Sequence, residues 1–132
     1  MSPYRIPLLP GYRMAVLKAQ FGERVAAPLL VDTGSSRTIV VPDLAQRLGL
    51  DVGHPLATMR LYGVGGDQHA VVCQVDLLSI GAIVLRQHEV VVADLPEILR
   101  VDGLIGLDVL SRFRVTFEFD KRTLVLRTPF AA

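Results

Sequence analysis

The sequence predicts a mainly β, single-domain protein, and three observations lead to this fold class. The apolar residues come in short, β-branched runs. Glycine, proline and aspartate punctuate these runs, which is typical of many short strands joined by turns. The 132 residues are 51% hydrophobic and 20% charged, which suits one domain with one buried core and no disordered segment.

The expected strands follow one another along the chain with few interruptions. Residues 12–20 and 25–31 form a hairpin around a turn at 21–24. The extended structure is interrupted at 32–35 and resumes at 38–41. The remaining expected strands cover 56–62, 68–80 and 83–93, followed by a closing hairpin of 115–119 and 123–126.

The clearest helix is expected at 42–49. Pro42 suits the first helical turn, Asp43 favours the positive end of the helix dipole, and Gly49 fits the left-handed residue that ends a helix. A second, shorter helix of one or two turns is expected at 108–113.

The composition points to no special class of partner. A net charge of +1 gives no argument for binding to nucleic acid or to an anionic membrane surface, and we expect no nucleic-acid partner. The longest apolar runs have four residues, whereas a membrane helix needs roughly 18 or more, so we expect no membrane segment. The N-terminus shows no signal-peptide pattern. We therefore expect a cytoplasmic protein if the chain is complete, and a periplasmic or membrane-anchored one if an N-terminal segment has been removed.

The motif that carries chemistry is Asp32-Thr33-Gly34. By itself it is weak, because such a triplet occurs by chance in roughly one chain in ten or twenty of this length, and it also suits a polar turn. Its context is more informative. The apolar run 29–31 leads directly into the carboxylate, and a carboxylate that ends a buried strand is costly unless it is hydrogen-bonded or useful.

Two further elements follow in the sequence. Gly63-Val64-Gly65-Gly66, flanked by Tyr62, joins two expected strands and suits the tip of a projecting hairpin. About seventy residues after Asp32, the run Leu104-Ile105-Gly106 places two aliphatic residues before a glycine and a short apolar helix.

With these three elements in this order, the chain resembles the retropepsin-like (clan AA) aspartic peptidases, particularly their bacterial single-domain members. The resemblance covers roughly 12–126. It implies a closed β-barrel of the acid-protease type with one or two short helices. We expect a peptidase domain at 12–127, preceded by an extended segment at 1–11 and followed by a tail at 128–132.

The resemblance also implies a mechanism. Each subunit of a homodimer contributes one carboxylate, here Asp32, and the two lie about 3 Å apart and share one proton. A water activated between them attacks the peptide bond without a cofactor. Thr33 is implied to bond across the dimer, and Gly34 to allow close approach of the backbone. Leu104, Ile105 and Gly106 would support the dyad from beneath, and the flap that covers a peptide or protein substrate would comprise Tyr62, Gly63, Val64, Gly65 and Gly66.

Ser35 departs from the alanine found in many retropepsins. Its hydroxyl can donate to ionised Asp32 and favour the charged form. We therefore expect an acid-shifted pH optimum relative to a Ser35→Ala variant, with Ser35 supporting the dyad.

Other interpretations of the same residues are less favoured. The glycine cluster has Gln68 where a dinucleotide fingerprint needs its third glycine. The histidines, His54, His69 and His88, are scattered, so we expect surface or loop positions and no metal site. Asp108 is expected to cap its helix or to bond backbone amides. Cys73 is expected to be a buried core thiol. A catalytically silent dimerisation or peptide-binding module of the same fold remains the alternative function.

Overall fold

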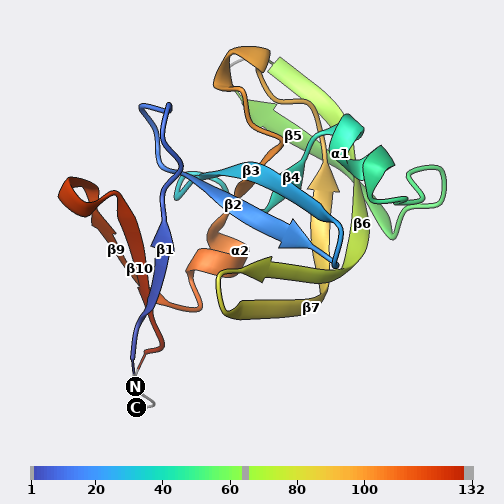
Figure 1. The fold of residues 1–132 in the computed structure, drawn as a ribbon. Helices are drawn as coiled ribbons and strands as arrows, with labels where there is room; N and C mark the ends of the chain where they lie inside the picture. The colour runs from blue at the N-terminus through green and yellow to red at the C-terminus, as the bar shows by residue number, and fades with distance from the viewer. Residues whose placement is uncertain (1, 64–65, 130–132) are drawn as a thin grey trace.

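The computed structural model describes residues 2–63 and 66–129. Within these residues the chain forms short strands, two α-helices and two single 3₁₀ turns (Figure 1). The strands are β1 (Tyr4–Pro7), β2 (Val16–Phe21), β3 (Val25–Val31), β4 (Ile39–Val40), β5 (Ala57–Gly63), β6 (Gly66–Ile80), β7 (Ile83–Val92), β8 (Gly103–Ile105), β9 (Arg114–Glu118) and β10 (Thr123–Arg127). The helical elements are α1 (Pro42–Arg47), α2 (Leu107–Leu110), η1 (Glu97–Leu99) and η2 (Phe119–Lys121).

Six strands close into a barrel, which confirms the predicted fold class. Their order is β2-β3-β8-β4-β7-β6, and β6 pairs back onto β2 through Phe21 and Leu78. β5 is added to the outer side of β6 and forms a long hairpin with it. Closure leaves the six barrel strands paired on both sides, whereas β5 keeps one free edge.

The strand β8 lies between β3 and β4, which are consecutive in the chain. It runs parallel to β3 and antiparallel to β4. Because neighbouring strands lie about 4.8 Å apart, the connection from β3 to β4 must cross about 10 Å, passing over the end of β8. That connection is residues 32–38, here called the Asp32 loop. The sequence had suggested a loop at 104–106, and the structure shows that its first two residues belong to a strand.

The core fills the barrel interior with aliphatic side chains. The largest fully buried ones include Leu17, Leu29, Leu78 and Ile105. Cys73 is 5% exposed within this core, so the prediction of a buried thiol is confirmed, and burial raises its pKa. Thr38 and His88 are the only polar side chains buried in the described part of the chain.

Both α-helices are short, with six residues in α1 and four in α2. α1 begins at Pro42, as expected, and Gly49 adopts the left-handed φ of +71° that follows the helix end. α2 begins one residue earlier than predicted and ends at Leu110. No helix among the described residues has the length and hydropathy that crossing a bilayer requires.

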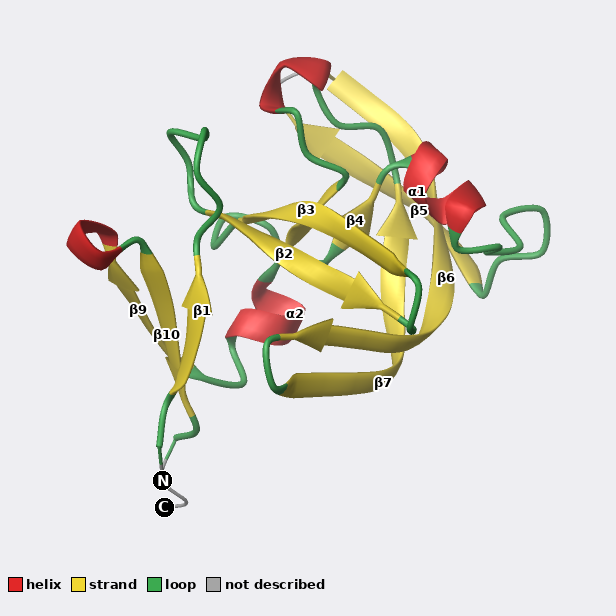
Figure 2. Cartoon of the chain, viewed as in Figure 1, coloured by secondary structure: helices red, strands yellow, loops and turns green. Residues whose placement is uncertain are grey.

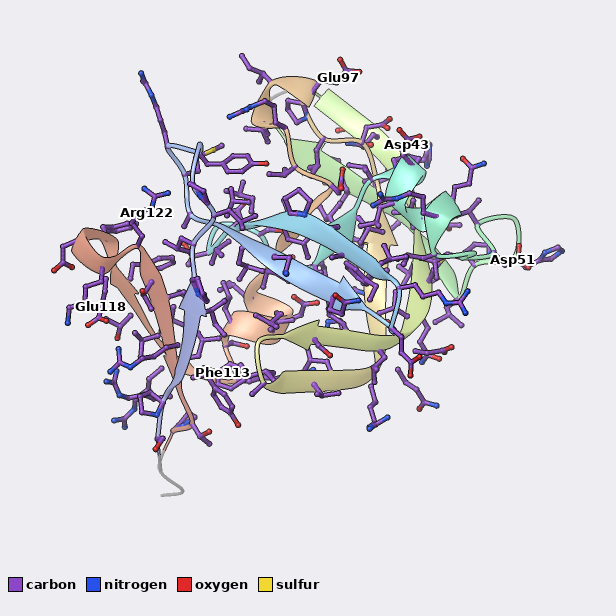
Figure 3. The ribbon with its side chains drawn as sticks, in the orientation of Figure 1. Asp43, Asp51, Glu97, Phe113, Glu118 and Arg122 are labelled. Atoms are coloured by element: carbon purple, nitrogen blue, oxygen red, sulfur yellow. The ribbon has the colours of Figure 1, made fainter. Side chains whose placement is uncertain are left out.

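The two ends of the chain meet in a second, three-stranded sheet with the order β1-β10-β9. Figure 1 shows this terminal sheet standing beside the barrel, with both termini at one tip, and Figure 2 shows α2 between the two sheets in this view. The N-terminal segment, expected only to be extended, pairs from Tyr4 with Leu126 to Pro7 with Thr123. Figure 3 places Glu118 and Arg122 on this sheet and Asp51 on the opposite side of the molecule.

Candidate active site

The Asp32 loop begins where β3 ends, and its backbone is held by the neighbouring strand. The Asp32 N–H donates to the carbonyl of Ile105 at 2.9 Å, and the Ser35 N–H closes a turn on the Asp32 carbonyl at 3.3 Å. The Gly34 N–H donates to Asp32 Oδ1 at 2.9 Å, which orients the carboxylate. Asp32 is half-buried, while Thr33 and Gly34 are exposed at the tip of the turn.

Gly106 lies beneath this loop in a space too small for any side chain. A Cβ placed on it would lie 2.5 Å from the Arg37 carbonyl oxygen and 2.7 Å from that of Ser35. Its φ of −105° is open to any residue, so contact and not backbone conformation demands glycine here. Gly103 is confined in the same way, by the Ile39 carbonyl oxygen. The aliphatic pair between these glycines is buried: Leu104 is 5% exposed and Ile105 is fully enclosed.

A ladder of hydrogen bonds joins the Asp32 loop to the turn that follows β8, residues 105–108, here called the Gly106 turn. The Leu107 N–H donates to the Ser35 carbonyl at 2.8 Å, and the Asp108 N–H to the Ser36 carbonyl at 3.2 Å. The Gly106 N–H donates to Thr38 Oγ1 at 3.3 Å. The Gly106 turn therefore holds both ends of the Asp32 loop, at Asp32 and at residues 35–38.

Ser35 does not act as its sequence suggested. Its hydroxyl donates to the carbonyl of Arg37 at 2.8 Å. A hydroxyl has one hydrogen, so in this conformation Ser35 cannot also donate to the Asp32 carboxylate. The expected acid shift of the pH optimum therefore lacks its structural basis, and Ser35 instead stabilises the loop.

A polar cluster of Thr38, His88 and Asp108 lies behind the Gly106 turn. Thr38 Oγ1 donates to Asp108 Oδ1 at 2.8 Å, and His88 Nε2 contacts Asp108 Oδ2 at 3.1 Å. Burial tends to raise the pKa of Asp108, but the hydrogen bonds from His88 and Thr38 and the charge of His88 outweigh it, so the pKa lies below its ordinary value.

The expectation of a surface position for His88 is wrong, because its side chain is 8% exposed. As expected, Asp108 bonds a backbone amide, that of Val109 at 3.0 Å, although Gly106 occupies the helix cap. Sequence reasoning missed Thr38 and His88 as site residues. No local signal marks them, since each reaches Asp108 from another part of the chain.

The predicted flap corresponds to the β5–β6 hairpin. Tyr62 pairs with Asp67 and Gly63 with Gly66, so the ladder continues up to the tip. Val64 and Gly65 lie outside the described residues. Tyr62 is 75% exposed.

A second apolar cluster connects this hairpin with the strands that carry the Asp32 loop. Its buried members include Ile39 and Leu104, and the partly buried Leu30, Met59 and Leu61 pack against them. Side chains of the β5–β6 hairpin and of the strands on either side of the Asp32 loop thus pack in the same apolar cluster.

The fold and this site define a class of protein. The family model described as aspartyl protease matches residues 17–109, which span the barrel from β2 to α2. The chain therefore belongs to the aspartyl protease family, and the resemblance to retropepsin-like enzymes is confirmed.

Among solved structures, the chain is similar to a retropepsin-like aspartic protease from Rickettsia conorii. The two share 22% sequence identity with a TM-score of 0.71, over 95% of this chain and 89% of the other. At this identity the likeness concerns the fold. A comparison with curated proteins gives no match.

Proposed function

We propose that this protein is an aspartic endopeptidase whose active site forms only when two copies of the chain associate. The observation that carries this proposal is that Asp32 lies in the exposed turn at the end of β3, and none of the contacts among residues 2–63 and 66–129 joins it to a second carboxylate. Two protomers related by a twofold axis would supply the two Asp32 side chains.

Two other carboxylates, Asp102 and Asp108, are the candidates for a second catalytic carboxylate within one chain, but each has other partners. Asp102 Oδ2 pairs with Arg47 at 3.5 Å, on the surface. Asp108 Oδ1 accepts hydrogen bonds from Thr38 and the Val109 amide, and its Oδ2 faces His88. Neither carboxylate is free to share a proton with Asp32, so the partner must come from another chain.

The chemistry follows from two carboxylates placed close together. Like charges about 3 Å apart cannot both ionise easily, so one Asp32 keeps a proton while the other stays charged. The charged member takes a proton from a water held between them. The protonated member donates to the oxygen of the scissile carbonyl, and the water oxygen attacks the carbon.

The surrounding residues take roles consistent with their positions. The Gly34 amide orients the carboxylate, and Thr33, which is exposed in the single chain, would bond with the partner loop. Leu104, Ile105 and Gly106 form the support beneath the dyad. The β5–β6 hairpin, with Tyr62 near its tip, would close over an extended peptide and exclude water.

The terminal sheet offers a surface on which a second copy can assemble. Within the described residues, β1 and β9 form its edges, and edge strands carry unpaired backbone groups that favour pairing with another chain. Phe119 is 69% exposed there and stacks on Phe117 with ring centroids 5.5 Å apart. We accordingly treat 12–127 as the peptidase domain, with β1 from the segment 1–11 adding to the terminal sheet and so to the assembly.

One experiment tests the proposal. The wild-type chain and Asp32→Asn are incubated with an unstructured polypeptide across about pH 3–8, and the oligomeric state is measured in the same buffers. We expect pepstatin-sensitive cleavage by the wild-type dimer and none by the variant. A stable dimer that cleaves nothing at any pH would instead support the silent binding module.

A further inference from the structure

The polar cluster behind the Gly106 turn brings together side chains from three separate elements. His88 comes from β7, Asp108 from α2, and Thr38 from the end of the Asp32 loop. Thr38 is fully buried and His88 is 7% exposed. Burial makes each of these polar groups expensive unless it is paired, and in this cluster each has a partner.

The backbone of β7 is distorted at the point that turns His88 inward. Ile83 and Leu85 point into the core, and strict alternation would next bury Gln87 and Glu89. Gln87 instead adopts a left-handed φ of +50°, which is unfavourable for a residue with a side chain. After it, His88, Val90 and Val92 take the buried positions. An unfavourable backbone conformation that persists indicates a local requirement, and here it brings an imidazole to Asp108.

We propose that His88 is a positioning residue of the peptidase, which holds the Gly106 turn beneath Asp32 by donating a hydrogen bond to Asp108. This inference rests on the proposed peptidase function and adds to it a residue that does not touch the substrate.

The contacts lead in order from His88 to Asp32. The His88 ring and Asp108 Oδ2 are 3.1 Å apart, and the other oxygen of Asp108 accepts the Thr38 hydroxyl. With its hydrogen so directed, Thr38 Oγ1 turns a lone pair to the Gly106 N–H. The residue before Gly106 is Ile105, whose carbonyl accepts the Asp32 N–H. Each bond orients the next, so the loss of the first loosens the last.

Only the donor capacity of His88 is needed for this role. A neutral ring with its hydrogen on Nε2 and a doubly protonated ring both donate to the carboxylate. Without that donor, Asp108 Oδ2 is left unpaired in a largely buried place. The carboxylate then turns toward water, and the Thr38 hydroxyl loses its acceptor.

The chain contains a matched control. His54 Nδ1 also lies 3.1 Å from a carboxylate oxygen, that of Asp51, but the two side chains are 88% and 69% exposed, against 8% and 19% for His88 and Asp108. Asp51 lies at the rim of the molecule (Figure 3). The same chemical pair in water should contribute almost nothing.

The test compares His88→Leu, His88→Gln and His54→Leu with the wild-type dimer. Leucine removes the donor at similar volume, whereas glutamine keeps an N–H group that can reach Asp108. We expect His88→Leu to lower kcat about 10- to 100-fold per folded dimer with KM little changed, because displacements below 1 Å in a supporting shell reduce turnover on this scale. We expect His88→Gln to recover kcat to within a few-fold, and His54→Leu to match wild type.

Amide hydrogen exchange gives a second measurement that needs no catalysis. Exchange at Gly106 and Asp108 should be at least about tenfold faster in His88→Leu and unchanged in His54→Leu. Equal kcat in wild type and His88→Leu, or glutamine failing as badly as leucine, would overturn the role of His88. If the wild-type chain cleaves nothing, the peptidase proposal fails, and amide hydrogen exchange alone decides whether His88 holds the Gly106 turn. Unchanged protection of these amides in His88→Leu would then refute the role of His88.

Discussion

Gly106→Ala should lower both the stability and the cleavage activity of the protein, because there is no space for the added methyl group. Its carbon would lie 2.5 Å from the Arg37 carbonyl oxygen, 2.6 Å from the Arg37 carbonyl carbon and 2.7 Å from the Ser35 carbonyl oxygen. Ordinary contact begins at 3.4 Å, so the backbone of the Asp32 loop must retreat by about 0.9 Å. These atoms belong to main chain and cannot move aside as a flexible side chain would.

The expected magnitude follows from what such a retreat breaks. Overpacking costs about 1–3 kcal/mol. The bonds from Leu107 N–H to the Ser35 carbonyl and from Gly106 N–H to Thr38 contribute about 0.5–1.5 kcal/mol each. The free energy of unfolding should therefore fall by about 2–6 kcal/mol. Because the displaced loop carries Asp32, we expect the surviving folded dimer to cleave about 100-fold more slowly.

Urea unfolding at matched protein concentration measures the first effect, and cleavage per folded dimer measures the second. Gly53→Ala is the control, since its Cβ would lie 3.6 Å from Asp51 Oδ1, an ordinary contact, and should change stability by less than about 0.5 kcal/mol. A Gly106→Ala variant as stable and active as Gly53→Ala would refute the close packing on which the site depends.

Subunit mixing tests the shared site. When wild-type chains exchange subunits at random with a ninefold excess of Asp32→Asn chains, the cleavage rate should fall about tenfold, because most wild-type chains then have a variant partner. An unchanged rate would argue for a complete site within one chain. Asp108→Asn tests the buried carboxylate. Because the pKa of Asp108 is lowered on folding from 3.8, its charged form stabilises the protein above that pH and loses this effect as pH falls through the folded pKa. The difference in free energy of unfolding between wild type and Asp108→Asn, measured by urea unfolding, should therefore become smaller in acid. A difference that stays constant with pH would count against the pairing of Asp108 with His88 and Thr38. Tyr62→Ala should raise KM several-fold with stability within about 0.5 kcal/mol, since the side chain is 75% exposed; an unchanged KM would remove Tyr62 from the flap contact.

Much of the fold was predictable because its signals are local. The hairpin of β2 and β3 is marked by its apolar runs and turn, and α1 by Pro42 at its start and Gly49 after its end. The β5–β6 hairpin was visible as two strand patterns separated by glycines. Each of these features depends on residues only a few positions apart.

The parts that were missed depend on distant residues. β8 has three residues, too few for a periodic pattern. It is a strand because it pairs with β3, where Val31 lies opposite Ile105, 74 positions later in the chain. β1 is a strand because the other end of the chain pairs with it. The scattered histidines were all expected at the surface or in loops, and the buried position of His88 was missed because it depends on a break in the alternation along β7 at Gln87, whose left-handed φ no propensity indicates.

By itself the sequence singled out Asp32, Gly106 and the glycine-tipped hairpin as candidate site elements, since Asp32, Gly106 and the 63–66 cluster are each marked by their own neighbours in the chain. Only the tertiary structure decided how these parts are held. It brought His88, Asp108 and Thr38 together behind the turn. The reason is physical: a hydrogen bond requires its donor and acceptor to meet, and for residues 20 to 70 positions apart only the completed barrel brings them together.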